Sequence, residues 1–131
     1  MSTVLVVDDE AGARRALMRV LEGQGYETIG ACDGKEAMQT LESRTQECRT
    51  PDLILLDVLM PELDGLEMLE VLHADPRWKA LPVVMLTAVS DINCIRRAEQ
   101  LGAKAYLVKA TFSVAEMLGH VREYTGQVAA T

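Results

Sequence analysis

The sequence lacks the marks of secreted and membrane proteins. None of its apolar runs approaches the roughly 20 residues that a membrane-spanning helix needs. Residues 1–10 have neither the basic start nor the small-residue cleavage site of a signal peptide. Cysteine is scarce, and Cys32, Cys48 and Cys94 are scattered without a metal-ligand spacing. We therefore expect reduced thiols in a cytoplasmic protein that makes no membrane contact.

Basic residues are also in short supply. The chain has 13 Lys and Arg residues against 20 Asp and Glu residues, which gives a formal net charge of −7. This charge disfavours binding to a phosphate backbone, so we expect no direct contact with nucleic acid. No glycine-rich phosphate loop follows the first apolar run, residues 3–7, which argues against a flavin- or nucleotide-binding protein.

Apolar runs alternate with amphipathic segments along the 131 residues. The runs predict five strands, at residues 3–7, 26–31, 52–57, 81–88 and 105–109. Helical spacing follows each strand, and capping-box pairs such as Asp64 with Glu67 mark helix starts. The fourth helix is predicted over 91–101, and the polar stretch 42–51 is predicted to be the longest irregular surface loop. The last helix is predicted to bury one face, made of Val114, Met117, Leu118, Val121 and Tyr124.

Strands that are separated by helices must be parallel, and near-continuous apolar strands indicate a sheet covered on both faces. The fold class is therefore α/β: a doubly wound, five-stranded parallel sheet with right-handed crossovers. Length and composition fit one domain, residues 1–125, followed by a short tail, 126–131. Trp78 lies on a connection, and we interpret it as a packing residue.

Polar side chains end four of the five apolar runs. Asp8 and Asp9 end the first, Asp57 the third, Thr87 the fourth and Lys109 the fifth. Because parallel strands present their carboxyl ends at one edge of the sheet, these side chains are expected to converge there. Adjacent carboxylates repel one another and need a cation, and oxygen-only ligation suits Mg²⁺.

Each of these residues also has an ordinary explanation. Asp8 and Asp9 precede a helix, where acidic side chains cap backbone N–H groups. Thr87 can be a satisfied hydroxyl at a strand end, and Lys109 can be a solvated surface lysine. The occurrence of all of them at one edge of the sheet favours a shared site.

Four motifs carry a resemblance to a known family: "VLVVDDE", "DLILLDVLMPELDGLEML", "LPVVMLTA" and "GAKAYLVK". With them the chain resembles a receiver domain of the two-component response regulators, from about residue 3 to residue 125. The resemblance implies a flavodoxin-like sheet with strand order 2-1-3-4-5, an order that the chemotaxis member of this family illustrates. The Met1 start and the short tail favour a receiver that works alone, although a receiver excised from a longer chain is the alternative.

The resemblance also implies the roles of the acidic residues. Asp57 is the phosphoacceptor, which takes a phosphoryl group from a sensor histidine kinase or a histidine phosphotransfer protein. Mg²⁺ is bound by Asp9, Asp57 and the backbone carbonyl of Leu59, while Asp8 acts mainly through a metal-bound water.

The remaining implied roles concern the phosphoryl group and the switch. Lys109 and Thr87 bind phosphoryl oxygens, and Tyr106 is the aromatic switch. The surface made by the fourth helix, fifth strand and fifth helix then binds a downstream target protein. The domain is regulatory rather than an enzyme, apart from self-phosphorylation by small donors and self-dephosphorylation.

The sequence departs from the family pattern at three positions. Ala110 follows Lys109 where family members commonly have proline, so we predict a trans 109–110 peptide bond and a reshaped loop. Leu59 and Val89, two residues after Asp57 and Thr87, are apolar and cannot orient an attacking water. They predict slow self-dephosphorylation.

Two other functions compete with this interpretation. A degenerate receiver would act as a constitutive protein-binding module, but it would have lost the acceptor or the acidic pair. A phosphatase of the haloacid dehalogenase type, with an aspartate nucleophile, needs a second acid two residues after Asp57, where Leu59 stands.

Overall fold

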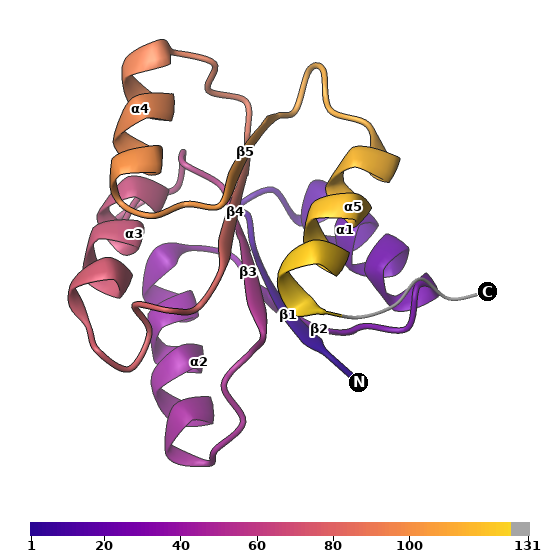
Figure 1. Ribbon diagram of the computed structural model, residues 1–131, viewed down its shortest axis with the longest axis vertical. Coiled ribbons are helices and arrows are strands. Elements are labelled where there is room, and N and C mark those ends of the chain that lie inside the picture. Colours follow the sequence, from indigo (N-terminus) through magenta and orange to yellow (C-terminus); the bar gives the residue numbers. More distant parts are fainter. Residues whose placement is uncertain (127–131) are drawn as a thin grey trace.

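The computed structural model describes residues 1–126 and shows strands and helices in strict alternation (Figure 1). The strands are β1 Thr3–Val7, β2 Glu27–Ala31, β3 Leu53–Leu56, β4 Val83–Thr87 and β5 Ala105–Val108. The helices are α1 Ala11–Gly23, α2 Gly34–Gln46, α3 Gly65–Ala74, α4 Ile92–Gln100 and α5 Val114–Thr125. Within this part of the chain, no helix is both long and apolar enough to cross a membrane.

The strands form one parallel sheet in the order β2-β1-β3-β4-β5. Helices α2, α3 and α4 cover one face, and α1 and α5 cover the other (Figure 1). The predicted doubly wound fold and its strand order are confirmed. Because the chain order reverses direction across the sheet at β1 and β3, the crevice beyond their carboxyl ends is where such folds bind ligands.

The side chains of the central strands divide between two hydrophobic cores. One core, under α2–α4, contains Leu5 and Ile54, and the other, under α1 and α5, contains Val6 and Leu55. Every residue of β1, β3 and β4 is buried, as expected for strands enclosed on both faces. The ends of these buried strands therefore lie at defined places at one edge of the sheet.

Two predictions about the elements are wrong. Residues 42–51 are not wholly a loop, because α2 continues to Gln46. The polar composition of 42–46 is that of a helical turn facing solvent, and the buried Leu41 holds its start against the core. Val114, predicted on the buried face of the last helix, is 45% exposed because it is the first residue of α5.

Trp78 has the packing role predicted for it. It is the largest fully buried side chain, and its indole Nε1 donates a hydrogen bond of 3.0 Å to Thr45 Oγ1 at the end of α2. The Arg77 guanidinium lies 4.0 Å from the ring centroid and also binds Asp75 and Glu42. These hydrogen bonds from Arg77 hold the pKa of Asp75 below its ordinary value. The α3–β4 connection is therefore joined to α2 by one buried ring and one arginine.

Removing this ring should destabilise the fold. We expect Trp78→Ala to lower the free energy of unfolding by about 3–5 kcal/mol, because it leaves a large cavity and removes the hydrogen bond from the indole to Thr45. Arg77→Ala, which removes only half-exposed contacts, should cost less than about 1 kcal/mol. Urea denaturation followed by circular dichroism measures both. An unchanged midpoint for Trp78→Ala would contradict the packing role.

Candidate functional site

Two buried carboxylates lie at the carboxyl edge of the sheet. Val7 and Leu56 are register partners at the ends of β1 and β3, and Asp8 and Asp57 are the next residues of each strand. Asp8 is 2% exposed and Asp57 5%, whereas Asp9 is open to solvent. One carboxylate oxygen from each of the three lies within 4.8 Å of the others. Burying two such acids this close requires a compensating cation.

Lys109 supplies that positive charge. It follows the end of β5, and its Nζ lies 2.6 Å from Asp8 Oδ2 and 3.2 Å from Asp57 Oδ2. Burial alone would lower the pKa of the Lys109 ammonium, but the hydrogen bond to Asp8 and the charge of Asp57 outweigh it, so the pKa is raised. Lys109 is therefore firmly protonated and joins two strand ends that are far apart in the sequence.

The second oxygen of each buried carboxylate accepts a backbone N–H. Asp8 Oδ1 accepts from Glu10 at 3.0 Å, and Asp57 Oδ1 accepts from Leu59 at 3.3 Å. The capping explanation for the acidic pair is thus met in part by Asp8, while Glu10, the N-cap residue of α1, makes no side-chain cap bond. The capping bond and the Lys109 contact use different oxygens of Asp8, so one role does not exclude the other.

The β3–α3 loop turns sharply over the site. A side-chain Cβ at Gly65 would collide with the Asp57 carbonyl, so only glycine fits where α3 begins. Asp64 caps the helix in a capping box with Glu67, as predicted, and the Gly65 N–H donates to the Val58 carbonyl at 2.9 Å. Leu59, in this loop two residues after Asp57, is apolar and 60% exposed.

Thr87 and Tyr106 are linked through one residue. Thr87 is fully buried, and its Oγ1 accepts the Val89 N–H at 3.3 Å. The Tyr106 hydroxyl donates to the Val89 carbonyl at 2.7 Å and lies 3.5 Å from Cys94 Sγ. Burial, followed by the contact with Cys94, raises the pKa of Tyr106, which therefore stays a neutral donor. Thr87 and Tyr106 are thus connected through the backbone of a single residue, Val89.

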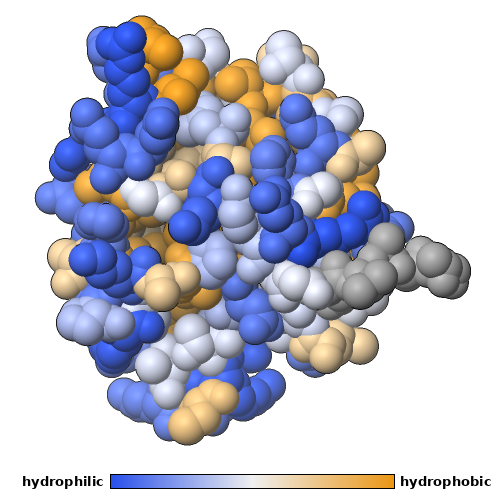
Figure 2. Space-filling model, in the orientation of Figure 1, coloured by the Kyte–Doolittle hydropathy of each residue, from blue (hydrophilic) through white to orange (hydrophobic). Residues whose placement is uncertain are grey.

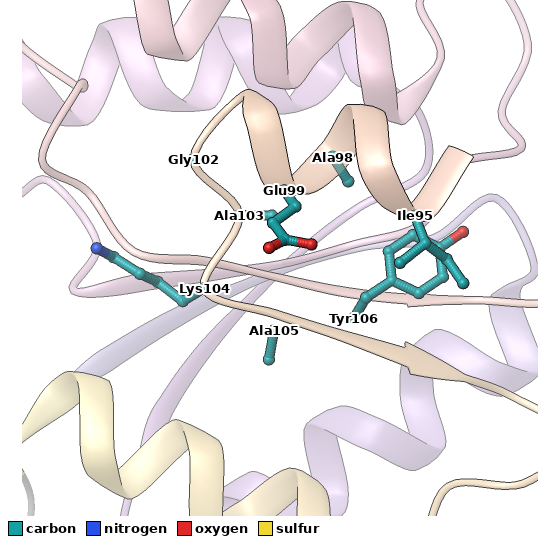
Figure 3. A pocket seen from close by; sticks show the side chains of 8 residues that line it. All are labelled: Ile95, Ala98, Glu99, Gly102, Ala103, Lys104, Ala105 and Tyr106. Carbon is teal, nitrogen blue, oxygen red and sulfur yellow. The ribbon is translucent and has the colours of Figure 1, made fainter. Parts of the chain in front are cut away.

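Tyr106 also lines a pocket between α4 and β5 (Figure 3). The pocket has a volume of about 450 Å³ and is lined by Ile95 and Glu99 from α4, by Tyr106 from β5 and by Lys104, which precedes β5. It lies on the outer surface of the domain rather than among the acids. In the view of Figure 2, hydrophobic atoms appear in small groups between hydrophilic side chains rather than as one continuous patch.

The peptide bond after Lys109 has the predicted geometry. The described chain contains no cis peptide bond, so the 109–110 bond is trans, which confirms that prediction. Residues Thr111 and Phe112 both donate their N–H groups to the Val108 carbonyl, at 3.0 and 2.9 Å. This compact turn starts at the end of β5 and leads to Ser113, which caps α5.

The site therefore combines an oxygen-only donor set with one fixed ammonium. Carboxylates and backbone carbonyls are the ligands that Mg²⁺ and similar hard cations take, so the donor chemistry fits the predicted metal. Sequence reasoning missed two contacts: the Val89 carbonyl under Tyr106, and Arg14 Nη1, which donates to the Asp8 carbonyl at 2.7 Å. Both acceptors are backbone carbonyls, which leave no mark on the residue types at those positions.

Comparison with curated proteins gives consistent matches. The model of the response regulator receiver domain matches residues 4–122. The chain is 37% identical over 125 residues to the probable transcriptional regulator ycf27 of Porphyridium aerugineum, covering 95% of this chain and 48% of that protein. It is 37% identical over 119 residues to the DNA-binding response regulator MtrA of Mycobacterium leprae (strain TN), covering 91% and 49%. The chain thus spans about half the length of the curated relatives it matches.

Solved structures show the same fold. The chemotaxis protein CheY4 of Vibrio cholerae has a TM-score of 0.80 and 31% identity, covering 95% of this chain and 98% of that one. The Mn²⁺-bound form of the response regulator Rcp1 has a TM-score of 0.80 and 26% identity, with full coverage of both chains.

Proposed function

The chain belongs to the response regulator receiver domain family, and we propose that Asp57 is its phosphoacceptor, with Mg²⁺ held at the adjacent acids. The family itself is one of regulatory phosphoacceptor domains in two-component signalling, and this chain is such a receiver. The single observation that supports the site assignment is the group of three carboxylates within 4.8 Å of one another, two of them in contact with the Lys109 ammonium.

The metal would be held by Asp9, Asp57 and the Leu59 carbonyl, with Asp8 acting through a metal-bound water. A bound Mg²⁺ supplies charge neutralisation for the oxygens of a transferring phosphoryl group. The Rcp1 neighbour, which holds Mn²⁺, supports this proposal, because Mn²⁺ and Mg²⁺ share a preference for oxygen ligands.

In the proposed transfer, an Asp57 carboxylate oxygen attacks phosphorus of a phosphohistidine. The new O–P bond forms as the N–P bond breaks, and the imidazole leaves with the electron pair of that bond. Lys109, which lies within hydrogen-bond reach of Asp57, neutralises an equatorial oxygen of the phosphoryl group. The phosphodonor is a sensor histidine kinase or a histidine phosphotransfer protein, and small acyl phosphates are alternative donors.

Thr87 then forms a hydrogen bond with the added phosphoryl group. Its hydroxyl proton is available, because the hydrogen bond with Val89 uses Thr87 Oγ1 as the acceptor. Donation to a phosphoryl oxygen draws Thr87 toward Asp57 and alters the Val89 backbone that the Tyr106 hydroxyl holds. The surface of α4, β5 and α5, where the pocket of Figure 3 lies, changes with it and binds a downstream protein.

Partner and compartment follow as parts of the proposal. We expect a protein target rather than nucleic acid for this domain, because its net charge is −7. The DNA-binding relative MtrA is about twice as long as this chain, so DNA contact by that protein does not transfer to the receiver. The proposed compartment is the cytoplasm, which agrees with three cysteines that are free thiols.

Phosphorylation of Asp57 is tested by acetyl phosphate in Mg²⁺ buffer. We expect the wild type to gain one phosphoryl group by intact mass, and Asp57→Asn to gain none, because an amide is not a nucleophile at phosphorus. Asp33→Asn is the matched control, since asparagine caps a helix as well as aspartate does and Asp33 lies outside the acidic cluster. Labelling of Asp57→Asn at the wild-type level would overturn the assignment.

The lifetime of the phosphorylated form is set by water access. Leu59 and Val89 offer no side-chain donor or acceptor that could orient an attacking water. We therefore expect the double variant Leu59→Asn, Val89→Glu to shorten the lifetime of the phosphorylated form about tenfold. This is less than the ~10²–10⁴-fold rate increase that positioned proton-transfer groups contribute. The backbone bonds of Val89 to Thr87 and Tyr106 survive this substitution. Decay of the labelled protein in Mg²⁺ buffer measures it.

The control for that experiment keeps both positions apolar. Leu59→Ile with Val89→Ile should decay at the wild-type rate, because neither side chain can orient a water. If Leu59→Asn with Val89→Glu leaves the lifetime unchanged, these two positions do not govern hydrolysis in this chain.

A further inference from the structure

We propose that Arg14 is a positioning residue for the acidic cluster, and that it acts by holding the backbone of the turn that carries Asp8 and Asp9. Arg14 lies on the first turns of α1 and contributes no oxygen to the site. The inference deepens the proposed function, and rests on it, because its consequence is the affinity of the cluster for Mg²⁺.

The first observation concerns the Asp8 carbonyl, for which the neighbouring strand β2 supplies no donor. The Asp8 N–H donates to the Ala31 carbonyl at 3.1 Å, which is the last step of the β1–β2 ladder. In a parallel ladder the N–H and C=O of one residue face the same neighbour, so the Asp8 carbonyl also points toward β2. Since β2 ends at Ala31, a guanidinium takes the place of the next strand donor: Arg14 Nη1 donates to the Asp8 carbonyl at 2.7 Å.

The second observation is that Arg14 holds the same turn at a second point. Its backbone N–H donates to the Glu10 carbonyl at 3.0 Å, the bond that opens α1. One residue therefore bonds to carbonyls on both sides of Asp9. Asp8 is in turn tied to Lys109, and its Oδ1 accepts the Glu10 N–H. Asp9, whose side chain is exposed, depends on this turn for its direction.

The third observation is that the sheet provides a path for the arginine stem. Gly30 on β2 has no side chain, and a Cβ there would lie 3.0 Å from Met18 Sδ, 3.3 Å from Arg14 Cδ and 3.4 Å from Arg14 Nε. The stem of Arg14 thus crosses β2 where the strand has only hydrogen. This route brings the guanidinium to the sheet edge in one defined place, and preorganised support of this kind typically changes metal affinity 10- to 100-fold.

Charge and positioning predict opposite effects of removing Arg14. A cation near the acids repels Mg²⁺, so if Arg14 acted only through its charge, its loss would tighten metal binding. If Arg14 fixes the Asp8–Asp9 turn, its loss weakens binding although a repulsive charge has gone. The direction of the change therefore distinguishes the two roles.

The experiment compares Arg14→Met with Arg15→Met in the whole chain. Methionine keeps an unbranched stem and a similar helix propensity, and Arg15 is an exposed neighbour whose loss removes the same charge. We expect isothermal titration with MgCl₂ to give a Kd at least fivefold weaker for Arg14→Met, and unchanged or slightly tighter for Arg15→Met. A Kd for Arg14→Met that equals or is tighter than that of Arg15→Met would overturn the proposal.

A second variant perturbs the arginine without removing it. Gly30→Ala should displace the stem and weaken Mg²⁺ binding in the same direction but less, with the charge retained. In the Arg14→Met background it should have no further effect, because the side chain it displaces has lost its guanidinium. Equal effects of Gly30→Ala in both backgrounds would show that it acts through β2 and not through Arg14.

Folding and the proposed function are checked separately. Urea midpoints of the variants identify any loss that comes from unfolding rather than from the turn. If the wild type itself binds no Mg²⁺ and takes no label from acetyl phosphate, the proposed function fails. If the wild type binds Mg²⁺ and Arg14→Met binds it equally well, only the role of Arg14 fails.

Discussion

The arrangement of this domain depends on one charge balance at the carboxyl edge of its sheet. Two aspartates, Asp8 and Asp57, are almost fully buried side by side, and the Lys109 ammonium contacts both. Two buried carboxylates side by side need a compensating cation, because like charges repel and the interior solvates charge poorly. The parallel sheet brings these groups together from segments that are 101 and 52 residues apart in sequence. The fold therefore brings the two carboxylates and the ammonium together at one edge of the sheet.

The same balance explains how the proposed phosphorylation of Asp57 would affect the surface of the domain. A phosphoryl group adds nearly two negative charges at a point where one cation is already shared. Two groups can respond to this added charge. Lys109 is shared between two carboxylates, and Thr87 has a hydroxyl proton that can be donated to a phosphoryl oxygen. Thr87 is joined through Val89 to Tyr106, which lies at the pocket between α4 and β5. The contacts from Thr87 through Val89 to Tyr106 thus connect the acidic edge of the sheet to that pocket.

The sequence predicted those features that residue types encode. Apolar periodicity gave the strand–helix alternation, and capping signatures located helix starts such as Asp64 and Ser113. It could not locate the end of α2, because the residues after Leu41 are polar whether they form a helix or a loop. Nor could it find the contacts of Arg14 and Tyr106, because their acceptors are backbone carbonyls of Asp8 and Val89. The grouping of the acids with Lys109 was predictable because a parallel sheet brings its strand ends to one edge.

Urea denaturation of Lys109→Met, with and without MgCl₂, shows whether Lys109 compensates the two buried carboxylates. Breaking a buried ion pair costs about 3–5 kcal/mol, and since the Lys109 side chain is 24% exposed we expect a loss nearer about 2 kcal/mol at neutral pH. Mg²⁺ should restore more stability to this variant than it adds to the wild type. Lys104→Met, which removes an exposed lysine of the same charge, should have little effect. If Lys109→Met without metal is as stable as the wild type, Lys109 does not compensate the two carboxylates.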